Sequence, residues 1–111
     1  MKLDDLRTLG VNVDEGIDRC LGNEAFYLQM LDRALDDPKF EKLGKAISNP
    51  DLDEAFELAH ALKGVAANLS LTALHNSLSV ITDKLRDRTQ MDYTDMYESV
   101  MKNKADLDAI R

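Results

Sequence analysis

Residues 51–88 read DLDEAFELAHALKGVAANLSLTALHNSLSVITDKLRDR, the stretch with the clearest helical pattern in the chain. Its second half carries apolar residues at spacings of three and four, at Leu71, Leu74, Leu78, Ile81 and Leu85. Such a narrow apolar seam suits packing between helices that run nearly antiparallel. The stretch therefore predicts two long helices, one over 51–69 and one over 71–88, with Ser70 as the N-cap of the second.

Weaker periodic segments on either side of this stretch predict further helices. Their expected ranges are 3–9, 13–21, 23–35, 38–48 and 92–110. Glycine, asparagine and proline mark the boundaries, because Gly22 suits a helix end, Asn23 suits an N-cap and Pro38 suits a first turn. Short connections between long helices favour antiparallel neighbours. We therefore expect an all-α fold, an up-down antiparallel four-helix bundle with additional short N-terminal helices, in which residues 1–111 form a single domain.

The composition excludes several classes of partner. Apolar residues make up 44% and charged residues 32% of 111 residues, which is an ordinary globular balance. The formal net charge of −7 disfavours both nucleic acid and an anionic membrane surface. No apolar run approaches the roughly 20 residues of a membrane span. The first residues lack the apolar stretch of a signal peptide, so a cytoplasmic location is the expectation.

One exposed histidine is predicted in the middle of the helix over 51–69. At about 100° per residue, one side of this helix collects the expected core residues Ala55, Leu58, Leu62, Val65 and Leu69. His60 points almost directly away from that side. Its outward neighbours are Asp53, Phe56, Glu57, Lys63, Gly64 and Ala67. A histidine in water keeps one unprotonated ring nitrogen at neutral pH, and that nitrogen is nucleophilic.

Three neighbours of His60 each admit two interpretations. Lys63 could pair with a phosphoryl group on the imidazole, or it could be ordinary solvated surface. Glycine inside a helix costs about 1 kcal/mol of stability relative to alanine, so Gly64 needs a compensating role. That role could be close packing of a neighbouring helix or clearance for a bulky partner. Its outward position favours clearance. Phe56 could tuck against a neighbouring helix or form part of a docking patch.

The run His60-Ala61-Leu62-Lys63-Gly64-Val65-Ala66 resembles the His-x-x-Lys-Gly motif of histidine-containing phosphotransfer domains. The segment from Leu21 to Tyr27 is similar to the family's entry into an earlier helix. The resemblance implies that His60 accepts a phosphoryl group from a receiver-domain aspartate and passes it to another receiver in two-component signalling. It implies that Lys63 holds the phosphoryl oxygens and that Gly64 leaves room for the partner. No kinase activity of its own is implied.

The same resemblance implies the cofactor and the partners. The receiver would supply Mg²⁺, so no cofactor is expected on this chain. The partners would be response-regulator receiver domains, with a hybrid sensor histidine kinase as a further candidate, and a monomer is expected. The chain is compatible with a free-standing protein and with a domain of such a kinase. The expected docking surface comprises His60 and Gly64 together with Asp53, Phe56, Glu57 and Ala67.

Two positions depart from the family's pattern. The family often has glycine where this chain has Ser70, and we expect the serine to cap the following helix with a small change in the turn. The family also often places a phosphate-facing glutamine or similar polar group on the next helix. Thr82 occupies that region here, and its hydroxyl could donate a hydrogen bond to the phosphoryl group.

Other functions fit the sequence less well. The main alternative is a helical binding module that uses the Phe56 and His60 face without phosphorylation. An enzyme with His60 as a general base would need an enclosed pocket, which a convex helix face does not predict. We interpret His75 as a partly buried structural residue and Cys20 as an inert buried thiol. Two histidines and one cysteine give no recognised ligand spacing, so no metal site is expected.

Overall fold

The computed structural model describes residues 1–111, and every regular element in it is an α-helix. The helices are α1 (Leu3–Thr8), α2 (Val13–Arg19), α3 (Glu24–Leu35), α4 (Lys39–Ser48), α5 (Leu52–Asn68), α6 (Thr72–Arg86) and α7 (Thr94–Asp108). The expected all-α class is confirmed. The expected helices are all present in the expected order, and most boundaries move inward by one or two residues.

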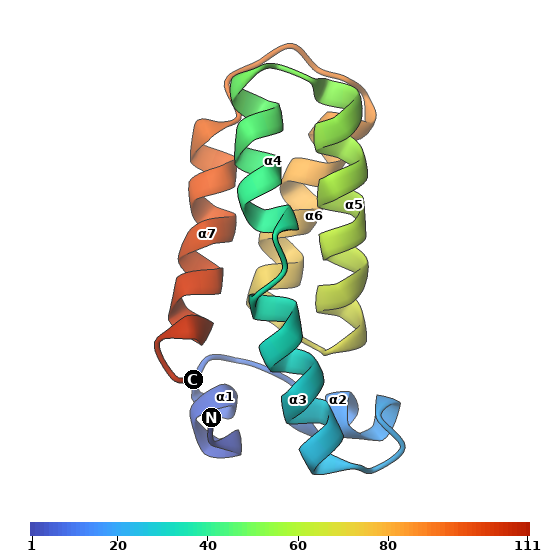
Figure 1. The fold of residues 1–111 in the computed structure, drawn as a ribbon, viewed down its shortest axis with the longest axis vertical. Coiled ribbons are helices and arrows are strands. Elements are labelled where there is room, and N and C mark those ends of the chain that lie inside the picture. The colour runs from blue at the N-terminus through green and yellow to red at the C-terminus, as the bar shows by residue number, and fades with distance from the viewer.

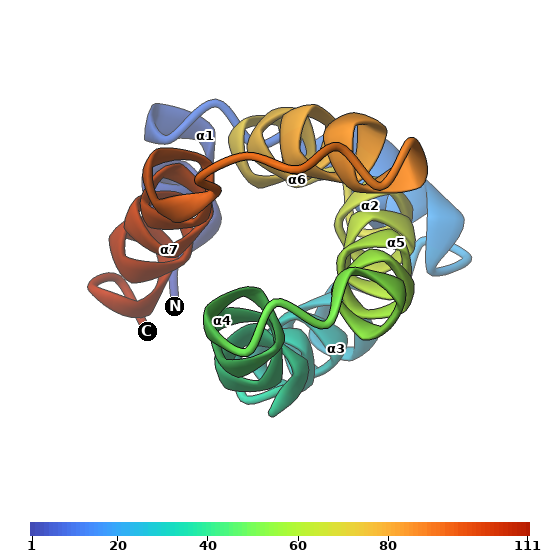
Figure 2. The same cartoon turned by 90° about the horizontal axis from the view of Figure 1, so that it is seen from above.

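The last four helices form an up-down bundle. Seen along its axis, α4, α5, α6 and α7 surround a common centre in chain order (Figure 2). Each of them runs opposite to the one before it, and α3 continues below α4 after a break at residues 36–38 (Figure 1). The short helices α1 and α2 lie at the lower end of the bundle (Figure 1). The predicted four-helix bundle with short N-terminal helices is therefore confirmed.

The apolar seam of α6 lies in the centre of this bundle. All five of its residues are buried, and three of them, Leu78, Ile81 and Leu85, are 0% exposed. They belong to one hydrophobic core that reaches from Leu6 in α1 to Leu107 in α7. The two N-terminal helices therefore share their core with the bundle.

The buried face of α5 is rotated relative to the expected one. Its buried residues are Ala55, Ala59, Leu62 and Ala66. The expected core residues Leu58 and Val65 are only partly buried. Since α5 packs against both α4 and α6, small alanine side chains on the inner face allow close approach, and the larger residues move to the flank.

The turn between α5 and α6 differs from the expectation at Ser70. The predicted serine N-cap is wrong, because α6 begins at Thr72 with Leu71 as its N-cap and no side-chain cap. Ser70 instead has a left-handed backbone with φ of 57°, and its buried Oγ has no hydrogen-bond partner. Its backbone N–H donates to the carbonyl of Ala67, and that of Leu71 donates to Ala66. Helices often end with this hydrogen-bond pattern, usually with a glycine in the left-handed position, which is occupied here by Ser70.

Tyr27 ties α3 and α2 to the lower end of α5. Its side chain is 0% exposed, and its hydroxyl donates a hydrogen bond of 2.8 Å to the carbonyl oxygen of Leu69. The ring also covers Gly16 of α2, where an added Cβ would lie 2.4 Å from Cε1 of Tyr27. Glycine at position 16 thus permits a close approach of α2 to α3, which supports the bundle end that leads into the turn at Ser70.

Burial of Tyr27 predicts a loss of stability at alkaline pH. Burial raises the pKa of Tyr27 to about 12, whereas an unfolded tyrosine titrates near 10. The folded state favours the neutral phenol, so its contribution is complete below pH 10 and is lost as pH rises toward 12. We expect the free energy of unfolding to fall by on the order of 2 kcal/mol across this window from this group.

Urea unfolding of wild type and Tyr27→Phe at several pH values checks this expectation. The variant should be about 1 kcal/mol less stable at neutral pH, because it lacks the hydrogen bond to Leu69. It should also lose less stability above pH 10. Burial raises the pKa values of Tyr93 and Tyr97 as well, so the difference between the two proteins isolates Tyr27. Parallel curves for the two proteins would contradict the expectation.

Candidate functional site

His60 lies in the middle of α5 and is exposed, as predicted from the helical period. None of the side-chain hydrogen bonds of the structure involves its imidazole. The ring instead forms an offset stack with the ring of Phe56, one turn earlier, with centroids 5.6 Å apart and planes inclined by 18°. Both ring nitrogens are therefore free of partners within the chain, and the imidazole is open to an incoming reactant.

The motif residues after His60 lie on the same side of the helix. Lys63 is partly buried and lies one turn further along α5. Gly64 is exposed, and a Cβ added there would meet no atom within 4 Å. Close packing of a neighbouring helix therefore does not explain this glycine. Of the two interpretations of Gly64, clearance for a partner is the one that agrees with the geometry.

Two interpretations were open for Phe56, packing against a neighbouring helix or membership of a docking patch, and the structure has features of both. Its side chain is partly buried. The guanidinium carbon of Arg88 lies 4.7 Å from the centre of its ring, and that of Arg86 lies 5.8 Å away. Phe56 thus packs against the C-terminal end of α6 and stacks on His60 at the same time.

The sequence interpretation missed Arg86 and Arg88. They follow Phe56 by 30 and 32 positions in the sequence, and the periodicity of one helix cannot show that they lie over its ring. The signal was the antiparallel pairing of the two long helices, since a reversal near residue 70 brings residue 88 close to Asp53. Nε of Arg88 donates to Oδ1 of Asp53 across 2.6 Å.

The remaining expected docking residues lie along the outer side of α5. Asp53 and Glu57 are exposed, and Ala67 is partly buried. With His60 and Gly64 they follow the three- and four-residue spacing of a single helix stripe. The geometry therefore gathers the expected residues on one convex surface, with the imidazole near its middle.

Thr82 is not part of this surface, and its predicted role in supporting the phosphoryl group is wrong. Its side chain is 0% exposed, and Oγ1 is buried without a hydrogen-bond partner. It lies among the buried residues of α6, between Ile81 and Leu85, and so faces the core. A hydroxyl in that position is not accessible to a group carried by the exposed imidazole.

The second histidine and the single cysteine do not belong to a cluster that could bind a metal ion. His75 is partly buried, as predicted, and Cys20 is a partly buried free thiol. No group of three or more histidine, cysteine, aspartate or glutamate side chains could hold a metal ion. No helix has the length and apolar character needed to cross a lipid bilayer.

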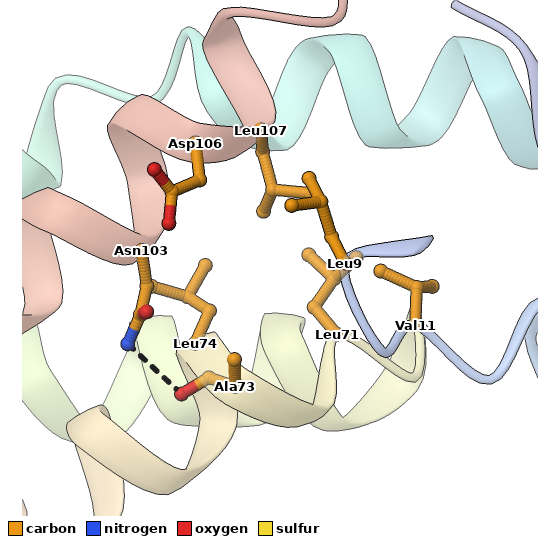
Figure 3. Close-up of a pocket in the computed structure, with 8 residues that line it drawn as sticks. All are labelled: Leu9, Val11, Leu71, Ala73, Leu74, Asn103, Asp106 and Leu107. Carbon is orange, nitrogen blue, oxygen red and sulfur yellow. Dashed lines mark hydrogen bonds between the residues drawn. The ribbon is translucent and has the colours of Figure 1, made fainter. Parts of the chain in front are cut away.

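The five main pockets of the surface lie away from the imidazole. None of the five main pockets is lined by His60, Lys63 or Gly64. The cavity in Figure 3 has a volume of about 30 Å³ and lies between the start of α6, the end of α7 and the segment after α1. It is mainly apolar, and beside it Asn103 donates a hydrogen bond to the carbonyl oxygen of Ala73. The general-base enzyme, which needs an enclosed pocket around His60, finds no support in these pockets.

A comparison with known protein families shows which family contains this helical bundle with its exposed histidine. The family model described as "Hpt domain" matches residues 26–111, which include α4 to α7 and the whole face around His60. The chain belongs to the Hpt domain family. Searches among curated proteins and among solved structures found no match. The resemblance seen in the sequence is thus confirmed. Hpt domains act in phosphotransfer in two-component signalling and interact with receiver domains in phosphorelays.

Proposed function

We propose that this Hpt domain is a relay intermediate that receives a phosphoryl group on His60 from one receiver domain and passes it to another. The observation that carries the proposal is the open imidazole, which makes no hydrogen bond within the chain and has empty space beside it at Gly64. The convex site suits a second protein better than a small substrate, because it offers no enclosing walls. The proposed unit is a cytoplasmic monomer.

The transfer step needs little chemistry from this chain. An unprotonated ring nitrogen of His60 attacks the phosphorus of an aspartyl phosphate on the receiver. A nitrogen–phosphorus bond forms as the bond between phosphorus and the aspartate oxygen breaks, and the carboxylate leaves with the electron pair. The ammonium group of Lys63 is positioned to offset the charge of the phosphoryl oxygens. Mg²⁺ on the receiver would supply further charge stabilisation, as is usual in phosphoryl transfer.

The proposed docking surface comprises the outer stripe of α5. Asp53, Phe56, Glu57 and Ala67 surround His60 and Gly64 on it. The receiver must approach closely enough to bring its aspartate to the imidazole, and the missing side chain at Gly64 allows this approach. The reverse reaction, from His60 to a second receiver, uses the same surface because the same atoms react.

The test follows one phosphoryl group through two transfers. A receiver domain labelled with ³²P is mixed with the protein and Mg²⁺, and a second, unlabelled receiver is then added. Several receivers from the source organism are used as donors, because such pairs are selective. We expect the label to leave the donor, to reach this protein and then to reach the second receiver. ATP alone should give no label.

Failure of every donor to label the folded protein would contradict the proposal. The binding-module alternative would then be favoured if a receiver still bound without transfer. Label that reaches this protein but never leaves it would contradict the relay role and leave only the acceptor role. Circular dichroism of the same sample establishes that the tested protein is folded.

A further inference from the structure

We infer that Phe56 and Arg88 form a clamp that fixes the plane of the His60 imidazole for phosphoryl transfer. The inference rests on the proposed function and adds a positioning role for two residues outside the His-x-x-Lys-Gly motif: Phe56 in α5, and Arg88 in the turn that follows α6. Phe56 contacts the imidazole directly, and Arg88 acts on it through Phe56. We call this pair of residues the aromatic clamp.

The aromatic clamp joins three planar groups through the ring of Phe56. The imidazole of His60 lies nearly parallel to the ring of Phe56, with 5.6 Å between centroids. The guanidinium of Arg88 lies over the same phenyl ring, 4.7 Å from its centre, within the range of a cation–π contact. Phe56 therefore contacts one planar group from α5, the imidazole, and one from the turn after α6, the guanidinium, and these contacts restrict the rotation of its ring.

Hydrogen bonds at both ends of the guanidinium hold Arg88 in place. Nε donates to Asp53 of α5 across 2.6 Å. Nη1 donates to the backbone carbonyl oxygens of Leu85 and Arg86, at 2.9 and 3.2 Å. Because the guanidinium is planar and rigid, these hydrogen bonds also fix the orientation of its plane. The ammonium group of a lysine has no such plane to fix. Arg88 is thus anchored to the end of α6 and to the start of α5.

The backbone of Arg88 supports a specific use of its side chain. Arg88 follows the last turn of α6 and has φ of 52°, in the left-handed region that favours glycine. Glycine would end the helix there without strain. Arginine at this position therefore carries a backbone strain that glycine would avoid. Here the side chain bonds to Asp53 and covers Phe56, and both contacts would be lost with glycine.

Orientation matters because the reactive lone pair of an imidazole nitrogen lies in the plane of the ring. In-line attack on phosphorus requires that plane to point at the receiver's phosphoryl group. No hydrogen bond orients the ring, and the hydroxyl of Thr82 is buried. The stack on Phe56 is therefore the restraint on ring rotation that the structure provides.

The test separates transfer from binding in single-turnover experiments with a phosphorylated receiver in excess. In Arg88→Gly we expect the maximal transfer rate to fall about tenfold, since small errors of alignment have effects of this size or larger. The receiver concentration that gives half the maximal rate should stay unchanged. Ser70→Gly is the matched control, because Ser70 also has a left-handed backbone and lies at the other end of α5. It should transfer at the wild-type rate.

Two variants of Phe56 make the test independent of Arg88. Phe56→Leu removes the ring and should reduce the maximal rate about as much as Arg88→Gly. Phe56→Tyr keeps the ring and should retain most of the wild-type rate. In ¹H–¹³C NMR spectra, the ring protons of His60 should move toward random-coil positions in Phe56→Leu and Arg88→Gly but not in Phe56→Tyr. A merely structural role would not produce this pattern.

Wild-type rates in both Arg88→Gly and Phe56→Leu would overturn the inference. A changed half-saturating concentration with an unchanged maximal rate would also overturn it, and would make these residues part of the docking surface only. If the wild type itself accepts no label from any receiver, the proposed function fails. Normal wild-type labelling with normal variants would remove the clamp and leave the proposed function intact.

Discussion

Arginine in place of Gly64 is expected to reduce phosphoryl transfer to His60 by at least about a hundredfold, the size of effect that misplacement of reacting groups by about 1 Å produces. Gly64 is exposed, lies one turn after His60 and has no atom within 4 Å of an added Cβ. An arginine side chain would extend over the space that the receiver must enter. It would also place a second positive charge beside Lys63, and this charge would attract the phosphoryl group. A loss of transfer would therefore be due to steric obstruction and not to electrostatics.

The fold should tolerate Gly64→Arg. Arginine has a higher helix propensity than glycine, so the free energy of unfolding should rise by up to about 1 kcal/mol. Transfer kinetics and urea unfolding on the same preparation check both parts. Gly64→Ala serves as the size control, and it should retain more transfer than the arginine variant. Normal transfer by Gly64→Arg would remove the clearance explanation of this glycine.

Gly16→Ala is expected to destabilise the fold strongly for a substitution that adds one methyl group. Its Cβ would lie 2.4 and 2.8 Å from two ring carbons of Tyr27 and 3.0 Å from the backbone oxygen of Leu69. The buried ring would have to move, and its hydrogen bond to Leu69 would move with it. Overpacking of this kind costs about 2–3 kcal/mol, more than the helix propensity of alanine returns.

Gly64→Ala is the matched control for this stability prediction. Both substitutions add one methyl group to a helical glycine, but only that at position 16 meets a neighbour. We expect the midpoint of thermal unfolding to fall by about 10 °C for Gly16→Ala and to rise by a few degrees for Gly64→Ala. Similar shifts in the two variants would contradict the packing described around Tyr27.

The sequence predicted those features that depend on short-range periodicity. The seam of α6 repeats at three and four residues, so its burial followed from the pattern alone. The exposure of His60 followed from its angular position on α5. The contact between Phe56 and Arg88 did not follow, because it joins α5 to the turn after α6 and depends on how far one helix is shifted along the other. Periodicity gives the face of a helix but not the register between two helices.

Two polar residues, Ser70 and Thr82, do not lie where the sequence predicts them. The sequence predicts Ser70 as a helix cap, because serine often has this role. The resemblance to the family predicts that Thr82 faces the phosphoryl group. In the structure both hydroxyl groups are buried without a partner. Ser70 occupies a left-handed turn, and Thr82 lies on the core face of α6, which continues one position beyond Ile81. Backbone conformation and helix packing decided both positions.

The most direct test of the account is the identity of the phosphorylated residue. Wild type, His60→Gln and His75→Gln are each mixed with the same phosphorylated receiver and Mg²⁺. We expect an acid-labile, base-stable label on the wild type and on His75→Gln, and none on His60→Gln. Because His60 is exposed and has no hydrogen-bond partner, its replacement should leave the helical content unchanged. Label that persists in folded His60→Gln would contradict the account and would direct attention to His75.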